Sequence, residues 1–271
     1  MKRVASADNR AVRLARRLKT KKWRDSLGCY LAEGPKLMAE AIEQGADILF
    51  AFFCEGDEGG RLDPELLRLA DLAAGSGAEA LSVPERVFAG MADTMTHQGA
   101  MAVLRKPAEA AMPADGSWLV LDRLSDPGNA GALIRTAAAA GFAGVLAVKG
   151  CADLYAPKTV RAAAGALFRA RVARAASADE AVGLLLSAGK PIMAADARAP
   201  ASCYETDLSG DFALVIGSEG NGLDTAFARA GRLLRVPMPG GGESLNVSAA
   251  AAAIMFESVR QRLARIEGRE Q

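Results

Sequence analysis

The stretch LVIGSEGNGL, residues 214–223, predicts a strand that runs into a glycine-rich turn. The apolar run at 212–216 is continuous, as is typical of a strand buried on both faces of a parallel sheet. Gly217, Gly220 and Gly222 follow, and glycine lets the backbone turn sharply and approach a ligand closely. The spacing differs from GxGxxG, and the chain has no GxxxxGKS or GxxxxGKT, so neither a dinucleotide fingerprint nor a P-loop is predicted.

A second strand, loop and helix are predicted upstream, in LDRLSDPGNAGALIRTAAAAGF at residues 121–142. Asn129 has the chemistry of a helix N-cap. Arg135 follows six residues later among Ala, Leu and Ile, where a purely apolar helix would not place a cation. A cation near the carboxyl end of a strand suits an anionic ligand such as a phosphate. A solvated arginine on the outer face of the helix is the alternative.

A third segment, RVPMPGGGESLNVSAAAAAIMFE at residues 235–257, predicts a strand that ends at Val236, a loop and the last helix. Three consecutive glycines at 240–242 are costly to order, which indicates a special backbone requirement. Ser244 or Asn246 would serve as the N-cap of the helix.

Around these segments the chain alternates between strand and helix patterns. The alternation over 26–105 forms one small α/β region, 106–117 (KPAEAAMPADGS) has the composition of a linker, and the alternation restarts at 118. Expected strands lie at 29–31, 48–53, 99–104, 118–121, 145–148, 168–172, 192–194, 212–216 and 233–236. Expected helices lie at 35–42, 64–72, 130–140, 157–165, 178–188 and 247–265, and a further short helix is expected to begin at Pro84.

The composition is that of a globular protein. Of the 271 residues, 51% are hydrophobic and 24% charged, which excludes disorder of the whole chain. Every long apolar run is interrupted before membrane-spanning length, and no apolar signal core follows Met1, so a reducing cytoplasm is the expected location. Four scattered cysteines and a single histidine, His97, do not predict a metal site. His97 is expected to have a structural or RNA-contacting role.

The first 25 residues are strongly basic. Ten lysines and arginines against two aspartates give residues 1–25 a net charge of +8, whereas the whole chain carries +1, so the remainder carries −7. A basic segment on an acidic body indicates a polyanionic partner, most simply RNA or DNA. A solubilising helix face is the alternative.

Together, the three segments resemble the SpoU (TrmH-like) family of RNA ribose 2'-O-methyltransferases, in the SPOUT superfamily. The matching residues are Asn129, Gly131 and 135–137, then 217–220 and Gly222, then 237–238 and 244–248. The region 26–105 more loosely resembles the N-terminal substrate-binding domain of 23S ribosomal-RNA methyltransferases, through LAEGPKLMAEAI at 31–42 and HQGAMAV at 97–103.

The resemblance implies an α/β fold in which a C-terminal SPOUT domain, with a trefoil knot and a mostly parallel sheet, follows a small α/β substrate-binding domain. The implied segments are a basic arm at 1–25, the RNA-binding domain at 26–105, the linker at 106–117 and the methyltransferase domain at 118–271. It also implies S-adenosylmethionine as cofactor, RNA (most simply ribosomal RNA) as substrate, and a homodimer formed through the C-terminal domain, without a metal or a membrane.

By the same resemblance, Arg135 positions and activates the ribose hydroxyl. Because a free arginine keeps its proton at neutral pH, orientation and electrostatics are its expected contribution rather than proton abstraction. The other residues expected in the catalytic site are Asn129, Asn246, Ser244 and Glu219. The residues expected to line the cofactor pocket are Gly217, Val236, Leu245, Ile216, Met238 and Ser218.

Three other functions compete with this hypothesis. A transfer-RNA methyltransferase is the nearest, although the separate N-terminal region favours ribosomal RNA. A non-catalytic RNA-binding or ribosome-assembly protein of the same fold is disfavoured by the presence of Asn129, Arg135 and Asn246. A nucleotide-dependent oxidoreductase is disfavoured by the missing dinucleotide fingerprint.

Overall fold

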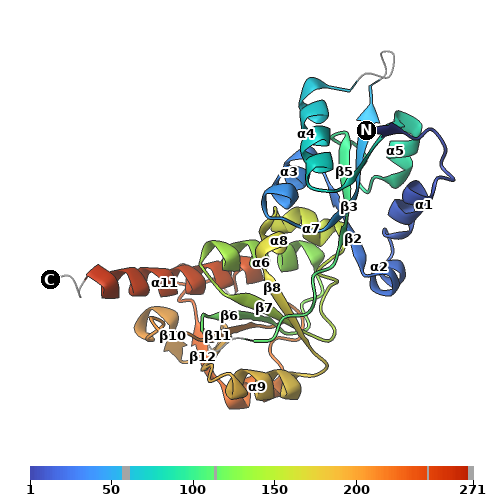
Figure 1. Ribbon diagram of the computed structural model, residues 1–271. Coiled ribbons are helices and arrows are strands. Elements are labelled where there is room, and N and C mark those ends of the chain that lie inside the picture. The colour runs from blue at the N-terminus through green and yellow to red at the C-terminus, as the bar shows by residue number, and fades with distance from the viewer. Residues whose placement is uncertain (57–61, 113–114, 243, 268–271) are drawn as a thin grey trace. The chain divides into compact units, whose positions relative to one another are not determined.

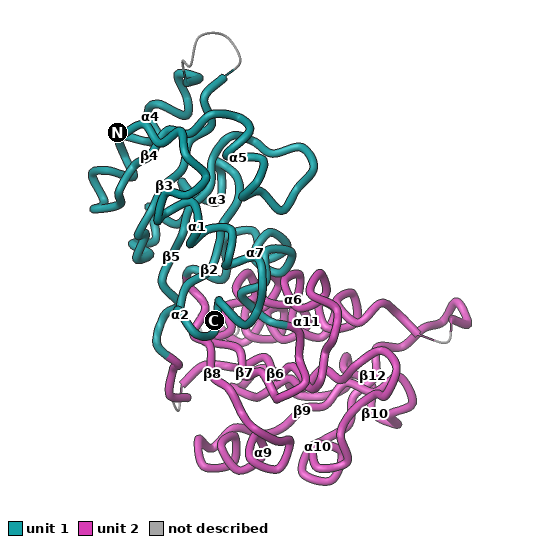
Figure 2. Tube along the Cα trace, turned by 90° about the vertical axis from the view of Figure 1, so that its right-hand side faces the viewer, with its two compact units in different colours: residues 1–108, 153–168 teal, residues 109–152, 169–271 magenta. Residues whose placement is uncertain are grey.

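A computed structural model describes the chain except for residues 57–61, 113–114, 243 and 268–271. Two compact units are distinguished in Figure 2. Unit 1 comprises residues 1–108 and 153–168, and unit 2 comprises 109–152 and 169–271. The segment 153–168, which the sequence analysis assigns to the C-terminal domain, therefore groups with unit 1. Two residues of the expected linker, 113 and 114, lie outside the described residues.

Unit 1 is built on a mixed five-stranded sheet with the order β1-β4-β3-β5-β2. Its strands are β1 (Lys2–Arg3), β2 (Cys29–Glu33), β3 (Ile48–Glu55), β4 (Glu79–Pro84) and β5 (Ala100–Arg105). Its helices are α1 (Arg10–Arg17), α2 (Lys21–Leu27), α3 (Pro35–Glu43), α4 (Pro64–Gly75), α5 (Glu85–Met91) and α7 (Pro157–Ala163). The strand β5 runs antiparallel to both β2 and β3, whereas β3 and β4 are parallel.

The basic N-terminal segment is part of this fold. Strand β1 extends the sheet by pairing in parallel with β4. Helix α1 begins after Asn9, whose side chain caps it. The helix buries Val12 and Ala15 in the core of unit 1, together with Leu18, which directly follows it. The basic side chains of α1 therefore lie on its exposed face, whereas its other face is buried in the core. Deleting residues 1–24 would remove core side chains together with the positive charge.

A buried ion pair attaches the segment 153–168 to unit 1. The guanidinium of Arg24 contacts the Asp153 carboxylate through Nε at 2.8 Å and Nη2 at 2.7 Å. Its Nη1 donates to the carbonyl oxygens of Leu18 and Lys19, both at 2.8 Å. The two charged side chains are only 5% and 6% exposed. The two opposite charges therefore compensate each other within unit 1, and two backbone carbonyl oxygens satisfy the remaining guanidinium nitrogen.

Replacing Asp153 with alanine is expected to destabilise the protein by about 3–5 kcal/mol, because it leaves the buried Arg24 guanidinium without a counter-charge. Urea unfolding followed by circular dichroism measures the loss. Alanine at Arg105, whose pair with Asp47 is 59% and 62% exposed, is the control and should cost less than about 1 kcal/mol. Equal losses in the two variants would contradict a buried pair.

Unit 2 contains a seven-stranded sheet, all of whose pairings are parallel, with the order β10-β12-β9-β11-β6-β7-β8. Its strands are β6 (Trp118–Leu121), β7 (Gly144–Val148), β8 (Arg171–Ala175), β9 (Ile192–Ala195), β10 (Ala201–Ser202), β11 (Ala213–Ile216) and β12 (Arg232–Arg235). Its helices are α6 (Pro127–Ala139), α9 (Ala178–Ser187), α10 (Thr225–Ala230) and α11 (Val247–Glu267), with a short 3-10 turn at Cys203–Glu205. Helix α8 (Ala166–Arg169) spans the boundary between the units.

The α/β class and the parallel sheet are confirmed. Figure 1 shows α6 and α11 together on one face of this sheet and α9 on the other. The central strands β6 and β11 are buried along their whole length, which explains their unbroken apolar sequences. Leu121, Ile216 and Ala195, the last residues of β6, β11 and β9, are register partners across the sheet. The loops that follow these three strands therefore begin side by side.

Some elements differ from those predicted from local sequence patterns. The strand expected at 168–172 lies at Arg171–Ala175, because Phe168 belongs to the short helix α8. Strands β4 and β10 and helix α10 were not predicted. Asp126, rather than Asn129, caps α6, and its carboxylate accepts the backbone N–H of Asn129 at 2.7 Å. No helix among the described residues is both long and apolar enough to cross a membrane.

Candidate functional site

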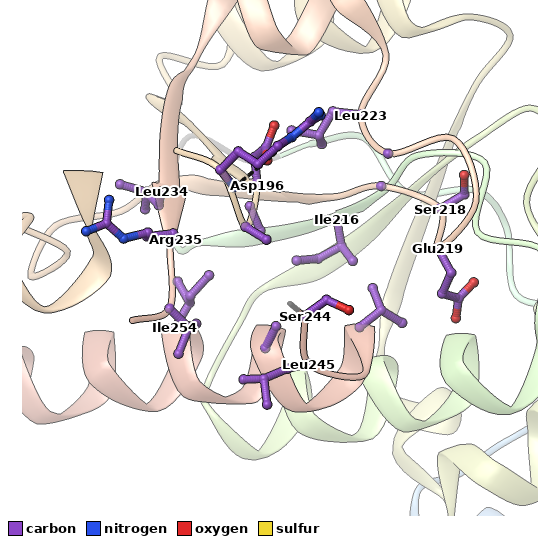
Figure 3. A pocket seen from close by; sticks show the side chains of 18 of the residues that line it. Asp196, Ile216, Ser218, Glu219, Leu223, Leu234, Arg235, Ser244, Leu245 and Ile254 are labelled. Carbon is purple, nitrogen blue, oxygen red and sulfur yellow. Dashed lines mark hydrogen bonds and ion pairs between the residues drawn. The ribbon is translucent and has the colours of Figure 1, made fainter. Parts of the chain in front are cut away.

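A cavity of about 470 Å³ opens at the carboxyl edge of the parallel sheet in unit 2 (Figure 3). Its walls come from the ends of β9, β11 and β12, the loops that follow them, and the first turns of α11. Crevices at the carboxyl edge of a parallel sheet are the usual ligand sites of such folds. The lining includes Asp196, Ile216, Gly217, Ser218, Glu219, Leu223, Leu234, Arg235, Val236, Met238, Ser244, Leu245 and Ile254.

The glycine-rich loop after β11 is closed by backbone hydrogen bonds. The Ser218 N–H donates to the carbonyl oxygen of Gly222 at 3.2 Å, and the Gly222 N–H donates to the carbonyl oxygen of Ser218 at 2.9 Å. The Ser218 hydroxyl accepts the Asn221 N–H at 3.1 Å. Gly222 has a φ of +64°, which disfavours other residues. A Cβ on Gly217 would lie 2.5 Å from the carbonyl carbon and oxygen of Gly222. The turn is therefore a close-packed cradle that only glycine at 217 permits.

A buried carboxylate fixes the far end of this loop. Asp122, fully buried directly after β6, accepts the backbone N–H of Asp224 at 2.6 Å. Arg123 donates to the same carboxylate from Nε at 2.9 Å and Nη2 at 3.2 Å, and this contact raises the pKa of the guanidinium. Asp224 in turn caps α10. Asp122 was not among the predicted site residues, although a carboxylate directly after a fully apolar strand was a usable signal.

One side of the cavity is apolar and the other is polar. Ile216, Leu234, Val236, Leu245 and Ile254 supply the apolar wall. This combination of an apolar slot and a glycine backbone cradle fits the adenine and the polar tail of a nucleoside cofactor.

The polar side contains three charged residues that were not predicted from the sequence, Asp196, Arg198 and Arg235. Asp196 follows β9 and accepts the Arg198 N–H at 2.8 Å. Arg235, at the end of β12, donates from Nη1 to the carbonyl oxygens of Ala199 and Pro200 at 2.7 and 2.8 Å. These contacts fold the loop after β9 over the end of β12.

All six residues expected to contact the cofactor lie on the wall of this cavity: Ile216, Gly217, Ser218, Val236, Met238 and Leu245. Glu219 and Ser244, expected in the catalytic site, also line it. Leu245 is 45% exposed, so its apolar side chain is available to a ligand. Glu243, the neighbour of Ser244 in the third motif, lies outside the described residues.

A polar cluster beside the cavity joins the three sequence motifs. Asn129 on α6 donates from Nδ2 to Glu219 of the glycine loop. Its Oδ1 accepts from Asn246 Nδ2 at 3.5 Å and from the Ser248 hydroxyl at 3.3 Å. Asn246 also caps α11, because its Oδ1 accepts the Ser248 N–H at 2.9 Å. Since Glu219 and Asn246 are exposed, the cluster can offer amide and carboxylate groups to a substrate.

Arg135 stands apart from this cluster. Its side chain is exposed on α6, does not line the cavity, and forms no hydrogen bond or ion pair with any of the described residues. Six residues separate it from Asn129, which corresponds to about 9 Å along the helix axis. The structure thus brings together Asn129, Glu219 and Asn246, places Ser244 at the cavity, and leaves the Arg135 guanidinium free for a ligand.

Two family models match the chain. The model described as "SpoU rRNA Methylase family" covers residues 117–256, and the "MRM3-like substrate binding domain" covers residues 9–102. The second match begins within the basic N-terminal segment, in agreement with the place of α1 in unit 1.

Similar proteins cover nearly the whole chain. The 23S rRNA (guanosine(2553)-2'-O)-methyltransferase RlmP of Bacillus subtilis is 34% identical over 94% of this chain and 98% of its own length. The crystal structure of an AdoMet-bound rRNA methyltransferase from Sinorhizobium meliloti is 30% identical, covers 96% of this chain and 97% of its own, and has a TM-score of 0.83. A structure concerning "2-OH methylation of C/U34 on tRNA" covers only 55% of this chain, with 30% identity and a TM-score of 0.50.

Proposed function

Because the chain belongs to the SpoU rRNA methylase family, we propose that it methylates a ribose 2'-hydroxyl of large-subunit ribosomal RNA. It is an RNA ribose 2'-O-methyltransferase, and S-adenosylmethionine is its cofactor. The observation that carries the site assignment is the meeting of the three motifs: the glycine cradle forms one wall of an apolar cavity, and the Asn129 cluster lies beside it.

The ribosomal substrate is supported by the extent of the similarity. The Bacillus subtilis relative, named for 23S rRNA, aligns with both units. The structure that concerns tRNA covers little more than half of this chain, whereas the substrate-binding model accounts for residues 9–102. The ribosomal substrate and the thiols of Cys29, Cys151 and Cys203, which form no disulfide bond, fit a reducing cytoplasm.

S-adenosylmethionine supplies an electrophilic methyl group when it is bound. The apolar wall around Ile216 and Leu245 would hold the adenine. The backbone of the glycine cradle at Gly217 would hold the polar tail of the cofactor. Asn129 and Asn246 would orient the ribose beside it. Arg135 would hold a neighbouring phosphate and bring the 2'-hydroxyl into line for attack, because alignment of the two reactants is a large part of the catalysis of such displacements.

Mapping 2'-O-methylation across the total RNA of a strain that lacks the gene tests this proposal. Loss of one modified ribose in 23S rRNA, restored by the purified enzyme and S-adenosylmethionine on RNA from that strain, is the expected result. Loss of a modification in tRNA, with intact ribosomal RNA, would overturn the proposed substrate.

The homodimer implied by the family resemblance has support in α11. One face of this helix is buried in unit 2, through Ala251, Ile254, Met255 and Ser258. A second apolar stripe, at a spacing of three and four residues, consists of Ala252, Phe256, Val259, Leu263 and Ile266. Phe256, Leu263 and Ile266 are 49%, 56% and 57% exposed. We propose that this stripe packs against a second copy of the chain, because such a repeat is a helix-pairing pattern.

Replacing Leu263 with glutamate is expected to convert the dimer to a monomer, because the carboxylate would be desolvated within the proposed interface. Light scattering after size exclusion gives the mass. Glutamate at Leu186, which is 58% exposed on α9, is the matched control and should leave the mass unchanged. A wild-type monomer, or a dimer that survives Leu263→Glu, would contradict this interface.

For RNA binding by unit 1 we propose an arginine stripe on α1. Arg13 and Arg17 follow Arg10 by three and seven residues, which places the three side chains on one face of the helix. All three are exposed. The Arg17 guanidinium lies 4.5 Å from the centroid of the Trp23 ring. A row of cations that ends at an aromatic ring suits an RNA backbone with an unpaired base.

Glutamate at all three stripe positions is expected to weaken RNA binding and to lower the slope of log affinity against log salt by roughly two, since each lost phosphate contact removes about 0.7–0.9 from the slope. The change leaves the buried face of α1 intact, unlike deletion of the segment. Glutamate at the exposed Lys36, Arg68 and Arg86 makes the same change in net charge elsewhere in unit 1 and is the control. Equal effects of the two triple variants would indicate a non-specific charge effect.

A further inference from the structure

A cysteine, a glutamate and the only histidine of the chain converge in unit 1, whereas the residues assigned to methyl transfer belong to unit 2. Cys54 lies near the end of β3, Glu85 is the first residue of α5, and His97 lies in the loop before β5. The Cys54 thiol donates to Glu85 Oε2 at 2.9 Å, and His97 Nε2 lies 2.7 Å from Glu85 Oε1. The Sγ, the imidazole nitrogen and the carboxylate oxygen all lie within 4.8 Å of one another.

We propose that Cys54, Glu85 and His97 form a binding site for a zinc-class divalent cation. Thiolate sulfur, imidazole nitrogen and carboxylate oxygen are the three protein ligands that zinc prefers. In a tetrahedral site with bonds of about 2.0–2.3 Å, ligand atoms lie roughly 3.3–3.6 Å apart. The present contacts of 2.7 and 2.9 Å to Glu85 and the outer limit of 4.8 Å bracket that range, so side-chain rotations are enough to close the site.

The cation would take over contacts that protons now make. On binding, Cys54 releases its thiol proton to solvent and its sulfur forms the metal bond. The neutral His97 moves its proton from Nε2 to Nδ1, and Nε2 forms the second bond. Glu85 supplies the third bond through a carboxylate oxygen. The net charge of the three side chains, −1 without the cation, becomes zero with it, so binding neutralises the cluster.

The surroundings fit a site that is held firmly on one side and open on the other. Cys54 is 7% exposed and the His97 side chain is 13% exposed, whereas Glu85 is 52% exposed. The His97 ring lies 4.5 Å from the ring of Phe88, which restricts its orientation. The open side at Glu85 gives a cation access from solvent and leaves a fourth position for water, as in three-ligand zinc sites.

The environment of His97 also sets the expected strength. Nδ1 of this ring is buried and has no hydrogen-bond partner among the described residues. Metal-bound histidines usually donate their second N–H to an acceptor, and losing that contact weakens binding by about 10–100-fold. We therefore expect micromolar rather than nanomolar affinity. Intervals of 31 and 12 residues separate the three ligands in the chain, so the spacing itself gives no metal motif.

The test uses the full-length protein, stripped with a chelator and titrated with Co²⁺ as a spectroscopic probe. A thiolate-to-cobalt charge-transfer band that saturates at one ion per chain and is displaced by Zn²⁺ is the expected result. Cys54→Ser should abolish the band, and Cys29→Ser, at another buried thiol of unit 1, should leave it unchanged. Saturating Zn²⁺ should raise the thermal midpoint of the wild type by a few degrees and leave that of Cys54→Ser unchanged.

If Cys54→Ser fails to fold, Glu85→Gln provides the same test at a half-exposed position, where a weaker cobalt complex is expected. A folded wild-type protein without a cobalt band, or a band that persists in Cys54→Ser, would overturn the proposal. Neither result depends on methyl transfer, so the metal site and the proposed function can fail independently.

Discussion

Arg135→Ala is expected to lower single-turnover methyl transfer to ribosomal RNA by several orders of magnitude, with S-adenosylmethionine affinity unchanged. The Arg135 guanidinium is exposed and has no partner among the described residues, so its donors are free for the RNA. The cavity proposed to hold the cofactor is lined by other residues, so cofactor binding should be spared. Stability should change by less than about 0.5 kcal/mol, as for other exposed side chains without contacts.

Two further variants make this prediction specific. Arg135→Lys should rescue activity only in part, because an ammonium group cannot reproduce the planar, multi-donor guanidinium. Arg171→Ala, an exposed arginine on β8, is the control for loss of one positive charge from unit 2. Near-normal turnover in Arg135→Ala, or an equal loss in Arg171→Ala, would refute the role assigned to Arg135.

Gly217→Ala is expected to reduce S-adenosylmethionine affinity by at least about 100-fold, because the added Cβ would lie 2.5 Å from backbone atoms of Gly222. Neither of these backbone positions can rotate away, so the loop between Ser218 and Leu223 must move and the cavity wall with it. Calorimetric titration with S-adenosylmethionine measures the change, and circular dichroism checks that the variant stays folded.

Gly220→Ala is the matched control, because it lies in the same loop and a Cβ there meets nothing within 4 Å. Its cofactor affinity should equal that of the wild type. Normal binding by Gly217→Ala would show that this cavity does not hold the cofactor, and equal losses in both variants would indicate that any change to the loop is harmful.

The parts of the structure that the sequence predicts are those with local signals. Residues 118–121 and 212–216 read as buried strands because both faces of a parallel sheet are covered and every position is apolar. The glycines at 217, 220 and 222 indicated a ligand-binding loop, because a backbone that packs closely at Gly217 has no room for a Cβ. Strand β4, with Glu79 and Ser82 among its residues and Pro84 at its end, gave no such signal.

What the sequence did not predict depends on distant contacts. Arg24 and Asp153 are 129 residues apart, so nothing local assigns 153–168 to unit 1. The Asn129 cluster was expected only through family resemblance, and its geometry needed α6, the glycine loop and α11 to meet. The trefoil knot likewise follows from the resemblance and stays a prediction.

The discontinuity of unit 1 has a consequence for synthesis on the ribosome. The first 108 residues emerge without α7, which packs against β2, and without Asp153, the counter-charge of Arg24. Strands β6 and β7 of unit 2 must leave the exit tunnel before either arrives. An N-terminal domain usually folds before the next domain is made. In this chain, unit 1 cannot be completed before residues 109–152 of unit 2 have been made. The last contacts of unit 1 can form only after translation has passed residue 168, when part of unit 2 has already been made.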